Sequence, residues 1–257
     1  MAERRLDWEG CLNVRDLGGH PTEDGTETRM GAVVRADSVR RLTQAGWEAL
    51  VAYGIRTIVD LRLSSELAED PPAKVPVDVI HISFFNEVSL EEQLAIAAQW
   101  FEAPDDVSAV REGYLAMLER NAANVAAAIS AVARAGEGGV LVHCAGGKDR
   151  TGLVSALLLR LAGVPISDIA ADYGLSAEYL RPSWSKWVDD AGDDAERELR
   201  RRLSASPAEA MTQVLETLER EHGSARGYLL ASGVPEADLE RAVARLRGAE
   251  PPLSFVS

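Results

Sequence analysis

An apolar run, a glycine-containing loop and a helix-forming run follow one another between residues 139 and 159, and no other feature constrains the fold as strongly. Residues 139–142 predict a buried strand, and residues 151–162 predict a central helix that is apolar nearly all round. The loop between them runs from His143 to Gly152. Such a loop points backbone N–H groups inward at the positive end of a helix. The sequence therefore predicts an α/β fold built around an anion-binding loop.

The loop carries a cysteine and, six residues later, an arginine. Cys144 would lie at the floor of the loop, where the helix N-terminus and nearby cations favour the nucleophilic thiolate. Arg150 can present a planar fork to two phosphate oxygens. Glycines allow the backbone to approach an anion closely, a lysine adds a second cation, and a threonine hydroxyl can bond the departing thiolate. The loop residues that we expect to contact the anion are Ala145, Gly146, Gly147, Lys148 and Thr151.

These residues predict phosphoryl transfer to Cys144, followed by hydrolysis of the phosphocysteine. The alcohol or phenol leaving group needs a proton from a general acid. Asp149 lies inside the loop, and Asp60 lies near the end of a predicted strand over residues 55–61. The carboxyl ends of parallel strands open onto the same crevice. We favour Asp149 as the acid, with Asp60 as helper or alternative, and the sequence leaves both open.

A free cysteine is more often an inert, buried thiol than a nucleophile. That interpretation suits Cys11, which has no basic loop around it. For Cys144 the glycines, arginine and threonine at this spacing outweigh it. Two cysteines in 257 residues make no disulfide framework, so we expect a reducing compartment.

Strands and helices alternate along the chain, which predicts a mainly parallel central sheet covered by helices on both faces. We expect one domain over residues 1–257, with a helical C-terminal part over residues 206–248. Ser206 and Pro207 predict the start of a helix there. The other expected elements are a hairpin over 20–36, helices over 43–53, 89–101, 106–120 and 122–134, and a strand over 77–82.

Residues 181–204 contain Trp184 and Trp187, followed by clustered aspartates and arginines. This segment predicts either a helical lid, with tryptophans facing the substrate, or an amphipathic helix pair with solvated charges. Residues 13–19 have two interpretations. They could bind substrate through Arg15, or they could form a structural turn, which we favour.

Three further polar residues also admit two interpretations. We expect them either to brace the rim of the anion site or to form ordinary ion pairs on the surface. These residues are Arg35, Asp37 and Arg62.

The segment from His143 to Gly152 resembles the signature loop of the cysteine-dependent protein tyrosine phosphatase superfamily. Its second half resembles an atypical bacterial branch, the mycobacterial protein tyrosine phosphatase B type. Segments 13–19, 59–62 and 227–229 are similar to that branch as well, and the resemblance spans about residues 7 to 247.

The resemblance implies hydrolysis of phosphotyrosine, often of phosphoserine and phosphothreonine, and in some members of phosphoinositides. It implies no metal. By position, Cys144 matches the nucleophile, Arg150 the phosphate clamp and Asp149 the acid of the loop.

A formal net charge of −14 argues against nucleic acid and anionic membranes as partners. Residues 1–10 show no signal peptide, and the uncharged stretch around Leu153 is too short to span a bilayer, so we expect a cytoplasmic protein without stable membrane association. The expected partners are phosphorylated proteins or peptides. We expect no cofactor and no metal, because His20, His81 and His222 lack metal-ligand spacing. The oligomeric state is not predicted.

Two other functions compete with a protein phosphatase. Lys148 adds positive charge that suits a multiply phosphorylated ring, which indicates a phosphoinositide phosphatase. A module that recognises phosphate without turning it over is the remoter alternative.

Overall fold

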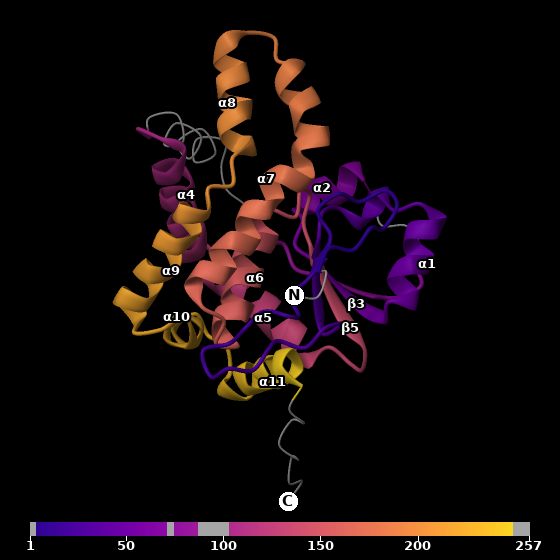
Figure 1. Ribbon diagram of the computed structural model, residues 1–257, viewed down its shortest axis with the longest axis vertical. Helices are drawn as coiled ribbons and strands as arrows, with labels where there is room; N and C mark the ends of the chain where they lie inside the picture. The colour runs from indigo at the N-terminus through magenta and orange to yellow at the C-terminus, as the bar shows by residue number, and fades with distance from the viewer. Residues whose placement is uncertain (1–3, 71–74, 87–102, 249–257) are drawn as a thin grey trace, which may run out of the picture.

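The computed structural model describes residues 4–70, 75–86 and 103–248 (Figure 1). A five-stranded sheet has the order β1-β2-β5-β3-β4. Its strands are β1 Arg15–Asp16, β2 Val33–Ala36, β3 Ile55–Asp60, β4 Asp78–His81 and β5 Gly139–His143. The helices are α1 Gln44–Ala52, α2 Ser64–Glu69, α4 Asp106–Arg120, α5 Ala122–Arg134, α6 Asp149–Leu161, α7 Ile166–Asp189, α8 Asp194–Ser204, α9 Ala208–His222, α10 Ala225–Ala231 and α11 Glu236–Arg247, with a 3₁₀ turn at Val39–Arg41.

The sheet is parallel except for its first strand. Strands β2, β5, β3 and β4 run in the same direction, and β1 pairs antiparallel with β2. Strand β5 is central and buried along its whole length. Asp60 of β3 pairs with His143 of β5, so both strands end at the same edge of the sheet. The loop after β5 opens at that edge.

Alternating side chains of β5 serve two different cores. Leu141 belongs to a smaller cluster with Trp8, Ile58 and Leu50 of α1. Val140 and Val142 point the other way, into the larger cluster beneath the remaining helices. This alternation follows from the two-residue period of a strand. The predicted mainly parallel sheet with helices on both faces is confirmed, and the coverage of the two faces is unequal.

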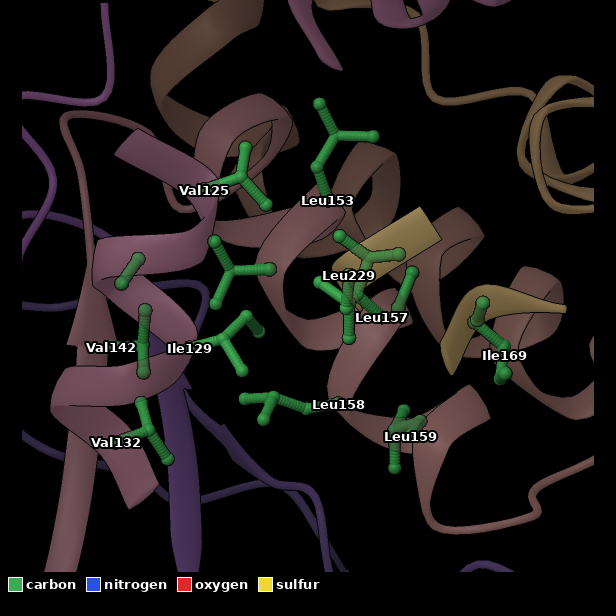
Figure 2. Packing of buried hydrophobic residues seen from close by; sticks show 14 of the residues in the cluster. Val125, Ile129, Val132, Val142, Leu153, Leu157, Leu158, Leu159, Ile169 and Leu229 are labelled. Atoms are coloured by element: carbon green, nitrogen blue, oxygen red, sulfur yellow. The ribbon is translucent and has the colours of Figure 1, made fainter. Parts of the chain in front are cut away.

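Helix α6 forms the centre of the larger core (Figure 2). Leu153, Leu157 and Leu158 of this helix are at most 1% exposed. They pack with Val125, Ile129 and Val132 of α5 on one side and Leu229 of α10 on another. Because α6 is buried nearly all round, its N-terminus and the loop that precedes it are held rigidly.

The predicted helices over 106–120 and 122–134 are confirmed at both ends by α4 and α5. Helix α6 starts at Asp149, two residues before the predicted start, because an acidic residue is favourable in the first turn. The cap predicted at Ser206 is wrong: α9 begins at Ala208, and Ser206 lies buried beside Tyr173.

The hairpin predicted over residues 20–36 holds only at its turn, with one bridge between Pro21 and Glu27. Strand β2 does not pair with residues 20–22. It lies inside the sheet, between β1 on one edge and β5 on the other. The helix predicted over 89–101 lies outside the described residues.

Helices α7 and α8 form a hairpin whose tip projects from the body of the molecule (Figure 1). The first half of α7 is packed into the core as far as Leu180, and the second half follows Pro182. The end of α8 is tied to the start of α4 by Arg201, which pairs with Asp106 at 2.9 Å. Among the helices of the described residues, none is long and apolar enough to cross a bilayer.

Candidate active site

The candidate site is the loop between β5 and α6. Cys144 follows the last residue of β5 and is 2% exposed, at the floor of the loop. Arg150 lies in the first turn of α6. Gly147 has a φ of 66°, and a Cβ there would lie 2.3 Å from the carbonyl oxygen of Ala36. Only glycine fits this close approach of the loop to the end of β2.

The carbonyl groups of the loop point outward, because each is held from outside. The Cys144 carbonyl accepts a hydrogen bond from His143 Nδ1 at 3.1 Å. The Ala145 carbonyl accepts one from the Ser38 backbone N–H at 3.0 Å. The carbonyls of Gly146 and Gly147 both accept from Asn13 Nδ2, at 3.1 Å each.

In a trans peptide the C=O and N–H point in opposite directions. Four outward carbonyls, from residue 144 to residue 147, therefore turn the next N–H group inward in each case. These N–H groups belong to Ala145, Gly146, Gly147 and Lys148. A ring of inward backbone donors of this kind has the geometry to bind an anion.

Arg150 closes one side of this ring and is held by Glu66. Its NH1 donates to Glu66 Oε2 at 2.5 Å, and its NH2 donates to Oε1 at 3.1 Å. Burial opposes the charge on Arg150, but the negative charge of a Cys144 thiolate and of Glu66 outweighs burial and raises the pKa of Arg150. A bidentate pair of this kind fixes the plane of the guanidinium.

Asp149 lies at the rim, with a side chain that is 39% exposed. Its Oδ1 accepts a hydrogen bond from the Tyr114 hydroxyl at 2.6 Å and an ion pair from Lys148 Nζ at 3.1 Å. The Tyr114 hydroxyl also contacts the Tyr173 hydroxyl at 2.8 Å. Tyr114 and Lys148 both contact the same oxygen of the carboxylate, Oδ1.

Lys148 is directed toward the end of α8. Besides Asp149, its Nζ donates to the carbonyls of Leu203 at 2.7 Å and Ala205 at 2.9 Å. These three partners match the three protons of the ammonium group. The ring of Trp184 lies 5.3 Å from Nζ, and a Cβ at Gly146 would lie 3.5 Å from the same ring. The α7–α8 hairpin thus lies against the loop.

Asp60 lies in a separate environment from Cys144. Asp60 accepts hydrogen bonds from Arg62 Nε at 3.0 Å and NH2 at 2.8 Å, and His143 Nε2 lies 3.6 Å from its Oδ2. Burial tends to raise the pKa of Asp60, but Arg62 and His143 outweigh it and lower the pKa. Asp60 and His143 face a small cavity on the α1 side of the sheet, lined also by Trp47.

Thr151 is fully buried, and its hydroxyl has no hydrogen-bond partner in the described part of the chain.

The interpretation as surface pairs is wrong for three polar residues, because all three are buried: Arg35, Asp37 and Arg62. Arg15 is also buried and binds Asp172 of α7. Within residues 4–70, 75–86 and 103–248, no three His, Cys, Asp or Glu side chains are grouped as metal ligands would be.

Sequence reasoning missed three participants. Glu66, four residues after the similar segment 59–62, was assigned no role. Tyr114 sits at a buried position of an amphipathic helix, where an aromatic residue normally indicates core packing. The contact from Asn13 to the loop joins residues 133 positions apart, so no local pattern could reveal it.

Comparison with known proteins gives one consistent result. Residues 6–248 match the sequence profile of the tyrosine phosphatase family. A tyrosine-protein phosphatase of Nostoc commune is 31% identical over 226 residues, which cover 84% of this chain and 74% of the relative. The triple specificity protein phosphatase PtpB of Mycobacterium tuberculosis is 28% identical over 275 aligned residues, covering 94% of this chain and 98% of the relative.

Proposed function

Because the chain belongs to the tyrosine phosphatase family, we propose that it hydrolyses phosphotyrosine, phosphoserine and phosphothreonine monoesters through a phosphocysteine on Cys144. The observation that carries the proposal is the ring of inward N–H groups, built by the outward carbonyls of residues 144–147, with Arg150 at its side. Such a ring holds the three non-bridging oxygens of a phosphoryl group and their developing charge.

In the first step the Cys144 thiolate attacks phosphorus, and the bond from phosphorus to the substrate oxygen breaks. Arg150, oriented by Glu66, binds two of the phosphoryl oxygens through its remaining donors. The leaving oxygen takes a proton from Asp149. Because Tyr114 holds Oδ1 of that carboxyl group, the transferred proton is carried on Oδ2.

In the second step water attacks the phosphocysteine. The Asp149 carboxylate accepts a proton from the water, the sulfur–phosphorus bond breaks, and inorganic phosphate leaves with the thiolate restored. We expect the hydroxyl of Thr151, which has no partner among the described residues, to turn toward the sulfur and bond it as it regains its charge.

Asp149 suits the role of acid better than Asp60. A general acid must lie within reach of the leaving group, and Asp149 is at the exposed rim of the loop, whereas Asp60 is buried. The lowered pKa of Asp60 keeps that carboxylate ionised beside Arg62. Its Oδ1 accepts the backbone N–H of Arg62 at 3.0 Å, in the turn whose Leu61 N–H donates to the His143 carbonyl at 2.8 Å. Asp60 therefore helps to hold the loop.

A phosphoprotein substrate is favoured over a phosphoinositide by the position of Lys148. The case for a multiply phosphorylated ring depends on a free cation at the loop, whereas the Lys148 ammonium bonds Leu203, Ala205 and Asp149. The mycobacterial relative is named a triple specificity protein phosphatase, which supports a range of substrates wider than phosphotyrosine alone. Phosphorylated proteins or peptides are the proposed partners.

Phosphate release from a panel of phosphopeptides and phosphoinositides tests the proposal. The wild-type protein should release phosphate from phosphopeptides in the presence of a chelator, and vanadate should inhibit it. Cys144→Ser should lose turnover, by at least about 10³-fold, while it still binds phosphopeptide. Arg150→Lys should lose both binding and rate, because the fork is removed.

Cys11→Ser is the matched control, because Cys11 is the other free cysteine and its Sγ bonds the Ser38 carbonyl outside the ring. It should retain wild-type rates. Turnover by Cys144→Ser would contradict a thiol nucleophile. Phosphopeptide binding by the wild type without any phosphate release would indicate a recognition module instead.

A further inference from the structure

The side chain of Asn13 supports the catalytic loop from behind. Asn13 is fully buried, and its Nδ2 donates to two consecutive carbonyls, those of Gly146 and Gly147, at 3.1 Å each. Holding these two carbonyls outward turns the N–H groups of Gly147 and Lys148 inward. A single side-chain amide therefore sets the orientation of two of the ring's donors.

Arg15 determines which way round the Asn13 amide lies. Arg15 NH1 donates to Asn13 Oδ1 at 2.5 Å. A guanidinium can only donate hydrogen bonds, so it selects the oxygen of the amide and leaves the NH₂ group to face the loop. The backbone N–H of Asn13 is fixed in turn by Asp37 Oδ1 at 3.0 Å. Neither end of the residue can turn without losing a buried hydrogen bond.

One carboxylate of α7 anchors this arrangement. Asp172 Oδ1 accepts from Arg15 Nε at 3.0 Å, and Oδ2 accepts from Arg35 NH1 at 3.0 Å. Arg35 NH2 then donates to the Gly147 carbonyl at 2.7 Å. The two supports of the Gly147 carbonyl, Asn13 and Arg35, thus share the same anchor.

The anchor is electrostatically strong. Burial tends to raise the pKa of Asp172, but Arg15, Arg35 and Arg4 outweigh it and keep the carboxylate ionised. Burial and the neighbouring Arg15 lower the pKa of Arg35 to about 10, which leaves its guanidinium charged at neutral pH. Two buried arginines therefore share one buried, ionised aspartate behind the loop.

We propose that Asn13 is a positioning residue for phosphate binding, which aligns the N–H groups of Gly147 and Lys148 and is itself oriented by Arg15 and Asp172. The inference rests on the proposed function, because it assigns Asn13 a part in the same anion site. Asn13 touches neither the substrate nor the sulfur, and it acts through the backbone of the loop.

The test is Asn13→Asp, which keeps the size of the side chain and its bond to Arg15 but replaces the donor to the two carbonyls by an acceptor. We expect the vanadate inhibition constant to rise about 10- to 100-fold, with a comparable fall in kcat/KM on an aryl phosphate. Asn13→Ala removes the donor without adding charge and provides a second measurement should Asn13→Asp not fold. Thermal unfolding is recorded for each variant.

Asn121→Asp is the matched control, because Asn121 is another buried asparagine whose Nδ2 donates to a carbonyl, that of Met117 at 2.8 Å. It should lower Tm without changing vanadate affinity. A lower Tm in the Asn13 variants with vanadate affinity within twofold of wild type would show that Asn13 serves the fold alone, and would overturn the inference. A wild-type protein that neither binds vanadate nor releases phosphate would instead overturn the proposed function and the inference together.

Discussion

The two aspartates that were candidates for the general acid differ in what holds them. Asp149 is at the rim, with Tyr114 on one carboxylate oxygen. Asp60 is 3% exposed and bound by Arg62. A group that must exchange its proton with an arriving substrate has to be accessible, whereas a buried carboxylate bound by an arginine is suited to holding the structure.

This difference predicts opposite responses to leaving-group chemistry. Asp149→Asn should lower kcat/KM, which reports the step that expels the leaving group, about 10²- to 10⁴-fold on an alkyl phosphate, and much less on an aryl phosphate whose leaving group needs no proton. Asp60→Asn should lower kcat/KM by a similar factor on both substrates, because it disturbs the turn at residues 60–62 that binds the His143 carbonyl. Steady-state kinetics on a series of phosphates of graded leaving-group pKa provides the measurement. A steeper dependence in Asp60→Asn than in Asp149→Asn would reverse the assignment.

At the scale of single residues, sequence reasoning works where function is local. Cys144 and Arg150 could be selected because strand, glycines and helix start lie within a few positions of them. The supports of the loop could not be selected, because Asn13, Arg35 and Ser38 reach it only through the pairing of β1, β2 and β5. For Lys148 the sequence predicts a place in the loop, but it does not predict that the side chain points to the end of α8.

At the scale of elements, the α7–α8 hairpin is linked to the loop mainly through Lys148. Its ammonium bonds the carbonyls of Leu203 and Ala205 where α8 ends. Trp184 of the same hairpin lies against Gly146. Since Cys144 is 2% exposed, we propose that the hairpin moves when substrate enters, and that Lys148 sets the cost of that movement.

Lys148→Met should therefore loosen the hairpin. Two charge-assisted hydrogen bonds are lost, each worth roughly 1.5–3 kcal/mol, so tryptic cleavage at the arginines of α8 should accelerate at least about tenfold. Mass spectrometry of the early fragments identifies the sites. Lys186→Met, at an exposed lysine of the same hairpin, is the control and should leave cleavage within α8 unchanged. Equal cleavage of Lys148→Met and the wild type would show that the hairpin is held elsewhere.

Elements with clear periodicity and caps were predictable. Helix α4 begins after Asp105, which caps the N–H of Ser108, and α5 carries its apolar residues on one face, so both ranges agree with the structure. Errors occurred where a polar residue had two possible uses. Asp149 was predicted to lie in the loop, but it forms the first turn of α6. Ser206 was predicted to cap a helix, but its side chain is buried and α9 begins at Ala208.

At the scale of the whole molecule, the buried His20 contributes stability that is lost in mild acid. Burial lowers the pKa of His20 to about 4, against a partly compensating Asp172, with Arg4 and Arg15 lowering it further and Asp168 raising it. The unfolded chain, with a histidine pKa of about 6.5, binds more protons below that pH. The contribution of His20 is therefore full above about pH 6.5 and is lost between pH 6.5 and 4, by on the order of 3 kcal/mol.

Urea unfolding at several pH values between 7.5 and 4.5 measures this slope. His20→Gln should flatten it, because glutamine can accept the hydrogen bond from Arg4 without taking up a proton. His222→Gln, at an exposed position, should leave the slope as in the wild type. An unchanged slope in His20→Gln would assign the proton uptake to another group, and His143 is the next candidate because burial lowers its pKa too.

The outward carbonyls of the loop have a consequence for how the protein becomes active during synthesis. Three of the four carbonyls have partners from residues 13, 35 and 38 near the start of the chain, and Asp172 of α7 anchors the partners at positions 13 and 35. A nascent chain that has left the ribosome only as far as α6 already contains Cys144, yet it lacks the Asp172 carboxylate that holds these supports of the ring. Competence for turnover should therefore arise late in translation, once the long helix beyond the loop has emerged and docked.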